Sequence, residues 1–163
     1  MPYVPLKYFL GIEAARSEKG LILCRWKYAL EIAEEHELLG AKPVEFPMET
    51  NHKLGLATGK FLQDPTQYWH LVGRLIYLTL SWTKSSYSVY ILSQFMQAAR
   101  EIHMATVRQV LRYLKGNHGL GIILRSDSDL QIVAFSDSDW GVCPLTRKSL
   151  TSYFVTLGGS PIS

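Results

Sequence analysis

Two aspartates near the C-terminal end are the residues of this sequence best suited to bind a metal ion. Asp137 and Asp139 follow the apolar run LQIVAF at residues 130–135. In an extended chain alternate side chains lie on one face, so both carboxylates could contact one hard cation. Carboxylates at the end of a buried strand are typical of two-metal phosphodiester cleavage. On the pattern alone, a loop whose solvated aspartates cap a turn is the favoured alternative.

Spacing excludes several other metal and nucleotide motifs. If Asp127 began an EF-hand loop, Ile132 would stand where glycine is required. The sequence has no phosphate-binding loop, nucleophile elbow or His-Glu-x-x-His motif. Cys24 and Cys143 lack CxxC spacing, which excludes a cysteine zinc site and favours a reduced intracellular chain with both as small buried hydrophobes. We expect His36, on an apolar helical face, to pack in the core.

A basic stripe is the second candidate for function. Arg108, Arg112 and Lys115 flank the apolar face of an expected helix over residues 102–115. Such a stripe could follow the phosphate backbone of a nucleic acid. It could also be a solvated face, and basic residues in a last turn complement the helix dipole without any ligand. The net charge of +3 is too small to decide between these interpretations.

The elements that must position these residues begin with a hairpin over residues 8–24, where apolar runs flank a Ser-Glu-Lys-Gly turn. A helix over 26–39 follows, with Gly40 expected at its C-terminal cap. Residues 40–63 are rich in proline and glycine and predict a long surface connection.

The clearest helix signal begins at Asp64, which stands at the N-cap before Pro65 and three residues before Gln67. Apolar residues then recur at helical spacing through Ile76. Gly73 interrupts this helix, so we expect it to admit a neighbouring backbone closely.

Two more helices are expected around the apolar residues of 91–96 and 104–114, and after Gly116 the period changes to two. The three expected strands span residues 120–125, 130–136 and 152–157. The last of them ends at Gly158 and Gly159 with an edge that another strand or helix would need to cover.

Length and composition limit the class of protein. A chain of 163 residues forms one domain or two very small ones, and 47% hydrophobic with 19% charged residues is typical of a globular protein. No apolar run reaches the roughly 18 residues of a membrane-spanning helix, and the N-terminus lacks a secretory signal pattern. We therefore expect no membrane partner.

Six motifs in a fixed order carry a resemblance to a known family. From Lys7 onward they read KYFLGIEAARSEKGLIL, PTQYWHLVGRLIYLT, ILSQFMQ, VRQVLRYLKG, GLGIIL and AFSDSDWGVCPLTRKSLTSYFVTLGGSPIS. In this order they resemble the Pol polyprotein of plant copia-type LTR retrotransposons. The match falls at the end of the reverse transcriptase and the start of the RNase H domain.

The resemblance implies an α+β fold in three parts. Residues 1–60 would hold the hairpin that ends the reverse-transcriptase palm, a helix and a linker. Residues 61–118 would form a helical thumb- or connection-like region. Residues 119–163 would be a truncated RNase H-like domain with an incomplete three-stranded sheet.

The resemblance also implies roles for the candidate residues. Asp137 matches the first metal-binding carboxylate of the family, and Asp139 belongs to the same motif. Mg²⁺ is the cofactor of the parent family. Arg108, Arg112 and Lys115 would contact the backbone of an RNA–DNA hybrid or template–primer. The remainder of the Pol polyprotein is the expected partner, and the cytoplasm or nucleus the expected intracellular compartment.

We expect the isolated chain to be inactive. The sequence has no adjacent pair of aspartates, which the polymerase site of this family uses, and no glutamate after Glu101, which its RNase H site needs. One surviving ligand cannot hold a second ion, so the chain alone should bind no Mg²⁺. Two alternatives remain: a host-retained nucleic-acid-binding or interaction module without catalysis, and a piece cut from an active polyprotein.

Overall fold

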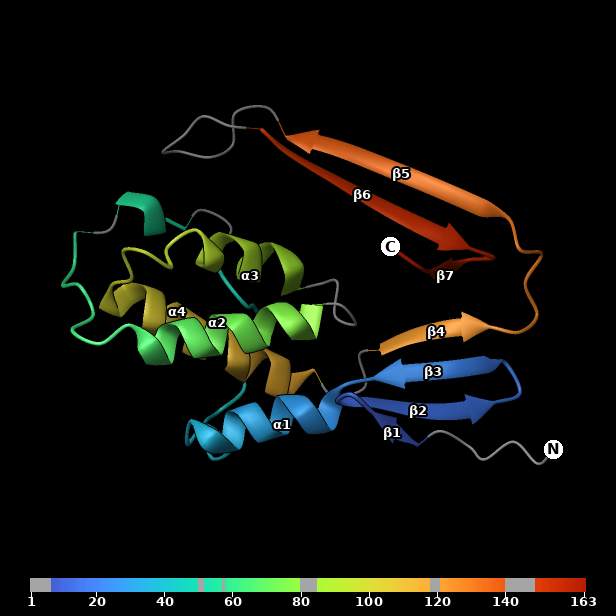
Figure 1. Cartoon of the computed structure of the whole chain (residues 1–163), viewed down its shortest axis with the longest axis horizontal. Helices are drawn as coiled ribbons and strands as arrows, with labels where there is room; N and C mark the ends of the chain where they lie inside the picture. Colours follow the sequence, from blue (N-terminus) through green and yellow to red (C-terminus); the bar gives the residue numbers. More distant parts are fainter. Residues whose placement is uncertain (1–6, 50–51, 57, 80–84, 118–120, 140–148) are drawn as a thin grey trace.

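The computed structural model describes residues 7–49, 52–56, 58–79, 85–117, 121–139 and 149–163. Its helices gather in one body, with two antiparallel sheets beside and above it (Figure 1). The helices are α1 (Trp26–Glu35), α2 (Thr66–Thr79), α3 (Ser86–Ser93) and α4 (Glu101–Gly116), with a 3₁₀ turn at Leu54–Leu56. The strands are β1 (Tyr8–Phe9), β2 (Ile12–Ser17), β3 (Gly20–Cys24), β4 (Gly121–Arg125), β5 (Ile132–Asp139), β6 (Leu150–Leu157) and β7 (Ser160–Pro161). This mixture agrees with the expected α+β class.

The hydrophobic core lies between the four helices. Its fully buried side chains include Ile32, Tyr68, Leu71, Val72, Leu75, Leu92, Val107, Val110 and Leu111. The Tyr68 hydroxyl donates to the Leu92 carbonyl at 2.7 Å, which satisfies this polar group inside the core. Ile76, expected on the buried face, is 47% exposed, because the inner face of α2 runs through Leu75 and Leu78 instead. No helix among the described residues is long and apolar enough to cross a membrane.

Helix α1 ends four residues earlier than expected. Glu37 has a φ of 56° and its N–H donates to the Glu34 carbonyl, while the Leu38 N–H donates to the Ala33 carbonyl at 2.7 Å. These two bonds form a Schellman motif, in which the left-handed position is usually glycine. Here glutamate occupies it, so Gly40 is not the cap.

The start of α2 confirms the expected cap and corrects two details. The Asp64 Oδ1 atom accepts the Thr66 N–H at 2.9 Å. Hydrogen bonding from the Thr66 side chain, and then from this N–H, holds the pKa of the Asp64 carboxyl below its usual value. The Gln67 amide does not reach back to the cap but lies 3.4 Å from His36 Nδ1. Gly73 is exposed, and a Cβ added there would meet nothing within 4 Å. The expected close backbone approach is therefore wrong.

The N-terminal hairpin is confirmed, but its sheet contains a strand that was expected elsewhere. Strands β2 and β3 pair from Glu13↔Cys24 to Ser17↔Gly20, and β4 pairs along the other edge of β3. The sheet order is β1-β2-β3-β4. The expected sheet of all three C-terminal strands is therefore wrong for residues 121–125. The pairing places apolar residues opposite one another, with Leu21 facing Leu124 and Ile22 facing Ile123, and such cross-strand pairs stabilise a sheet.

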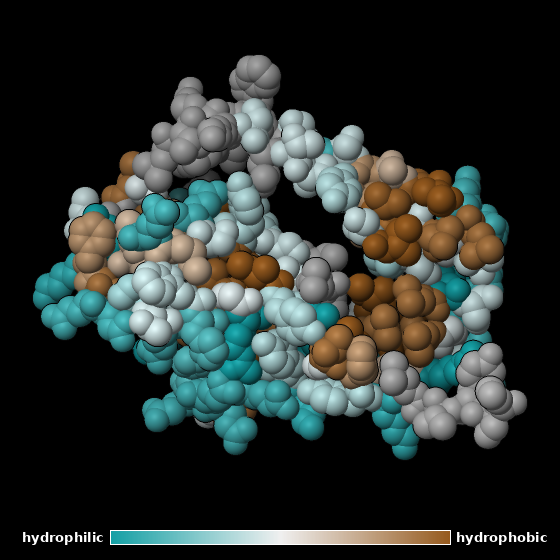
Figure 2. All heavy atoms as spheres, in the orientation of Figure 1, coloured by the Kyte–Doolittle hydropathy of each residue, from teal (hydrophilic) through white to brown (hydrophobic). Residues whose placement is uncertain are grey.

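The second sheet has the order β5-β6-β7. Gly158 and Gly159 both have positive φ, 55° and 74°, and make the two-residue turn that returns β7 alongside β6. The edge of β6 that was expected to be open is thus covered by Ser160–Pro161 only at its C-terminal end, at Thr156 and Leu157. The Ser160 Oγ atom accepts the Arg125 N–H at 2.8 Å and connects the two sheets. Apolar side chains gather over both sheets at the right of Figure 2.

Candidate functional site

Asp137 lies in the interior of β5, opposite Ser152, and is exposed. The strand continues to Asp139, which pairs with Leu150. The expectation that Asp137 ends its strand is therefore wrong, because β6 begins earlier than expected and keeps this part of β5 extended. The side chain of Asp139 lies outside the described part of the chain.

An aromatic pair borders Asp137. Phe135, two residues earlier and hence on the same face, pairs with Phe154 across the ladder, and their ring centroids are 6.4 Å apart. Phe135 is 60% exposed, so this face of the hairpin is open to water. Among the described residues, no group of three or more His, Cys, Asp or Glu side chains could hold a metal ion. Asp137 can offer one carboxylate to a hydrated Mg²⁺.

Asp127 and Asp129, which precede β5, form hydrogen bonds within the turn that leads into this strand. Asp127 accepts two hydrogen bonds from the Arg125 guanidinium, both at 2.9 Å, and these hold the pKa of the Asp127 carboxyl below its usual value. Asp129 Oδ1 accepts the Gln131 N–H at 3.3 Å. Both carboxylates therefore act as local structural groups.

The basic residues on α4 differ in whether their side chains bind other parts of the protein or lie exposed. Arg112 Nε donates to the Lys42 carbonyl at 2.8 Å, and Lys115 Nζ donates to the carbonyls of Ala41, at 2.8 Å, and Leu39. These half-buried side chains hold the segment after α1 against α4. Arg108, one turn earlier, is exposed. Its guanidinium is thus the member of the stripe best placed to meet a phosphate.

A groove runs beside Arg108. It has a volume of about 530 Å³ and is bounded by α4, the segment after α1 and Leu62. Its lining residues are Leu38, Ala41, Leu62, Glu101, Met104, Ala105, Arg108 and Arg112. Most of the lining residues are apolar, and Arg108 and Arg112 supply two guanidinium groups beside the carboxylate of Glu101, so the groove offers apolar surface together with donors for an anionic group.

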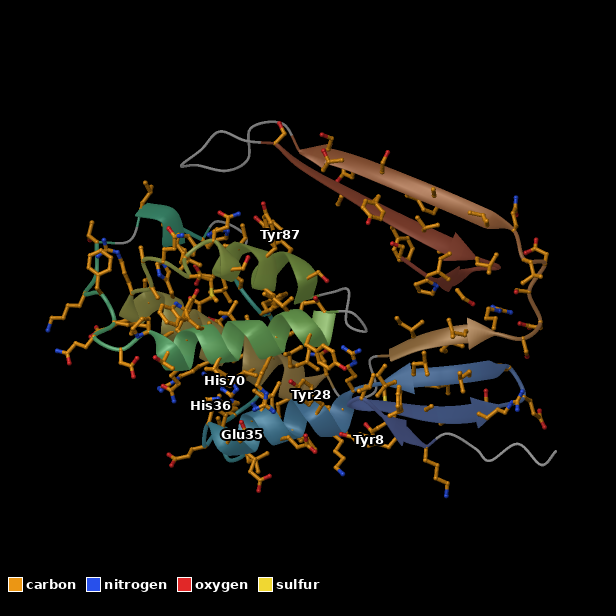
Figure 3. All side chains as sticks on the ribbon, in the orientation of Figure 1. Tyr8, Tyr28, Glu35, His36, His70 and Tyr87 are labelled. Atoms are coloured by element: carbon orange, nitrogen blue, oxygen red, sulfur yellow. The ribbon has the colours of Figure 1, made fainter. Side chains whose placement is uncertain are left out.

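A cluster of titratable residues where α1 meets α2 was not recognised from the sequence (Figure 3). Glu35 forms an ion pair with Arg74, and Arg74 Nε donates to the Tyr28 hydroxyl at 3.3 Å. Burial lowers the pKa of His36, and the positive charges of Arg74, His70 and Arg108 add to this effect against the opposing charge of Glu35. His36 is only partly buried and lies outside the hydrophobic core, so the expectation that it packs in the core is wrong, and its Nε2 is unpartnered among the described groups. The charge of Arg108 also acts on this cluster, in which Arg74 is paired with Glu35.

Cys24 forms no part of the contacts described for this cluster. Cys24 is half-buried, its thiol lies 3.6 Å from Glu13 Oε2, and burial raises the pKa of the thiol. The expectation for Cys143 lies outside the described residues.

The sequence is similar to proteins of plant transposons and mitochondria. It is 42% identical to the retrovirus-related Pol polyprotein from transposon RE1 of Arabidopsis thaliana, over 97% of this chain and 11% of that protein. It is 36% identical to an uncharacterized mitochondrial protein of the same plant, over 98% of this chain and 66% of that protein. A second such mitochondrial protein is 45% identical over 48% of this chain and 70% of its own length. No protein-family model and no solved structure matches the chain.

Proposed function

This chain belongs to the family of copia-type retrotransposon Pol polyproteins, and from that membership we propose that it joins the end of a reverse transcriptase to the start of an RNase H-like domain. The observation that carries the proposal is the 42% identity to a Pol polyprotein over 97% of the chain. Because the chain spans only 11% of that relative, RNA-directed DNA synthesis and hybrid cleavage are proposed for the parent. The compartment proposed is the cytoplasm or nucleus.

The exposed carboxylate on β5 supports the RNase H part of this proposal. Asp137 stands at the position that matches the first metal-binding carboxylate of the family, and its exposure leaves it open to a hydrated ion and a phosphate. Mg²⁺ would supply Lewis-acid stabilisation of the phosphate oxygens in the parent. The described residues alone offer no cluster that could hold two such ions, so we propose that this chain by itself is not a nuclease or polymerase.

We expect no cleavage of an RNA–DNA hybrid by the purified chain with either Mg²⁺ or Mn²⁺. One carboxylate on an open strand gives the metal too few ligands to position a water against a phosphate. Gel analysis of a labelled hybrid is the measurement, with Asp137→Asn as the matched variant. Metal-dependent cleavage that disappears in Asp137→Asn would show that the site is completed, for instance by a second copy, and would refute inactivity.

A second candidate function is nucleic-acid binding without catalysis, as in a host-retained module. The observation that favours it is the exposed Arg108 side chain, which lines the groove on α4 together with Arg112. Arg108 would contact a phosphate directly, while Arg112 and Lys115 would act through the segment they hold. The same contacts would help the parent hold an RNA–DNA hybrid.

We expect the affinity for an RNA–DNA hybrid to fall steeply as salt rises, and Arg108→Ala to reduce the slope of log K against log salt by about 0.9, the value for one phosphate contact. Fluorescence anisotropy of a labelled hybrid measures both quantities. Arg16→Ala on β2, another exposed arginine, is the matched control and should leave the slope unchanged. Equal slopes for the two variants would contradict a phosphate contact at Arg108.

A further inference from the structure

His103 joins two parts of the chain that are distant in sequence. Its Nδ1 atom accepts the N–H of Arg100, the N-cap residue of α4, at 3.0 Å. Its Nε2 atom lies 3.2 Å from the Leu54 carbonyl in the 3₁₀ turn. Because a carbonyl only accepts, Nε2 must carry the hydrogen and Nδ1 must be unprotonated. Both contacts together require the neutral ring.

The groups around the ring favour this neutral state. The side chain is 2% exposed and stacks on Phe95 with centroids 4.1 Å apart. The ring of Tyr68 on α2 lies 6.5 Å from the His103 ring, measured between centroids, and the Tyr68 hydroxyl donates to the Leu92 carbonyl. Burial lowers the pKa of His103 most, and the positive charge of Arg100 lowers it further, against the opposing hydrogen bond to Leu54. No carboxylate contributes to this shift among the described residues.

The same two segments are held together by backbone contacts nearer the surface. The Leu62 N–H donates to the Ala99 carbonyl at 3.0 Å, and the Glu101 N–H donates to the Lys60 carbonyl at 3.1 Å. The Arg100 guanidinium donates to the Gly59 carbonyl and lies 3.8 Å over the Phe61 ring. The buried end of this contact is His103, so its state decides whether the whole contact closes.

We propose that His103 is a proton-controlled clasp, which holds residues 54–56 and 58–62 against the start of α4 when neutral and releases them when protonated. A proton on Nδ1 would point at the Arg100 N–H, placing two donors face to face and leaving the helix cap unsatisfied. It would also place a cation at the positive end of the α4 dipole. Because Leu62, Glu101 and Met104 line the groove beside Arg108, release would open one wall of that groove.

The sign of the pH effect follows from the lowered pKa of His103. The unfolded chain takes up the proton near the ordinary value of about 6.5, whereas the closed clasp resists it. The stabilisation is therefore complete above that value and is lost as pH falls through the pKa of the folded state. His52, two residues before Leu54, has its pKa lowered by burial and adds in the same direction.

Hydrogen exchange of the whole chain, read by NMR between pH 7.5 and 4.5, tests the clasp. After correction for intrinsic exchange, we expect the protection of the Leu62 and Glu101 amides to fall by up to about tenfold per pH unit, the limit for one coupled proton. The Trp69 amide, which donates to Pro65 in α2, should not follow this change. The His103 imidazole ¹⁵N shifts should report protonation over the same pH range.

His103→Gln is the informative variant, because glutamine at this third helical position can still accept the N-cap N–H but does not titrate. It should remove the His103 part of the pH dependence and leave only the part that His52 adds, whereas His70→Gln, at an exposed histidine of α2, should retain both parts. If His103→Gln fails to fold, the wild-type titration still decides. Loss of Leu62 protection while His103 stays neutral, or a protonated His103 with protection intact, would overturn the proposal.

Discussion

Replacing Leu75 with alanine should lower the free energy of unfolding by about 3–5 kcal/mol, the range for a leucine removed from a packed core. Leu75 is fully buried on the inner face of α2, among side chains from the other helices. The loss combines the transfer free energy of the missing atoms with the cavity they leave. Urea unfolding followed by far-UV circular dichroism measures it as a lower midpoint.

Ile76→Ala is the matched control for this prediction. Ile76 is the next residue in the same helix but is 47% exposed. Its truncation removes little buried area, and alanine has the higher helix propensity, so we expect a change of under about 1 kcal/mol. Equal losses for the two variants would mean that α2 is rotated from the orientation described above.

The helices were largely predictable because their signals are local. Apolar residues at 3.6-residue spacing and the aspartate cap at Asp64 act within one or two turns, and α2 and α4 follow them closely. The errors also have local causes. The Schellman motif at the end of α1 places Glu37 where glycine is usual, and a glutamate in the sequence does not indicate a left-handed backbone conformation.

Strand partners were not predictable in the same way. A period of two identifies residues 121–125 as a strand, but it does not say that β3, about a hundred residues earlier, is the partner. The hydrophobic alternation of β4 would fit beside β5 equally well. The partner of β4 depends on where the end of α4 places the start of this strand, which is a property of the helical core rather than of the strand.

The candidate site was predictable only in part, because its partners are also distant. Asp137 was assigned by resemblance, and no spacing rule places it in the interior of β5. Arg112 and Lys115 bind backbone carbonyls of residues 39–42. Because every residue has a backbone carbonyl, the sequence does not indicate which of them a side chain binds. His103 could have been noticed, since it lies four residues before Val107 on the inner face of α4.

Replacing Gly20 with alanine should destabilise the protein by roughly 3 kcal/mol and separate β4 from β3. Gly20 has a φ of 139°, which side-chain-bearing residues rarely adopt, and an added Cβ would lie 2.1 Å from the Leu124 carbonyl oxygen. That oxygen belongs to the backbone of the paired strand and cannot move aside without breaking the ladder. The strain can therefore be relieved only if β4 moves away from β3.

The test combines urea unfolding with cross-strand NOEs between Leu21 and Leu124, which face each other in the ladder. Gly73→Ala is the matched control, since its new Cβ enters open space on α2 and should stabilise the chain by about 1 kcal/mol. The two substitutions should therefore change the free energy of unfolding in opposite directions, for steric reasons alone. Because β4 bonds to β7 through Arg125 and Ser160, loss of the ladder should also loosen the strands that carry Asp137. Retained NOEs with unchanged stability in Gly20→Ala would contradict the close approach of the Leu124 carbonyl to Gly20.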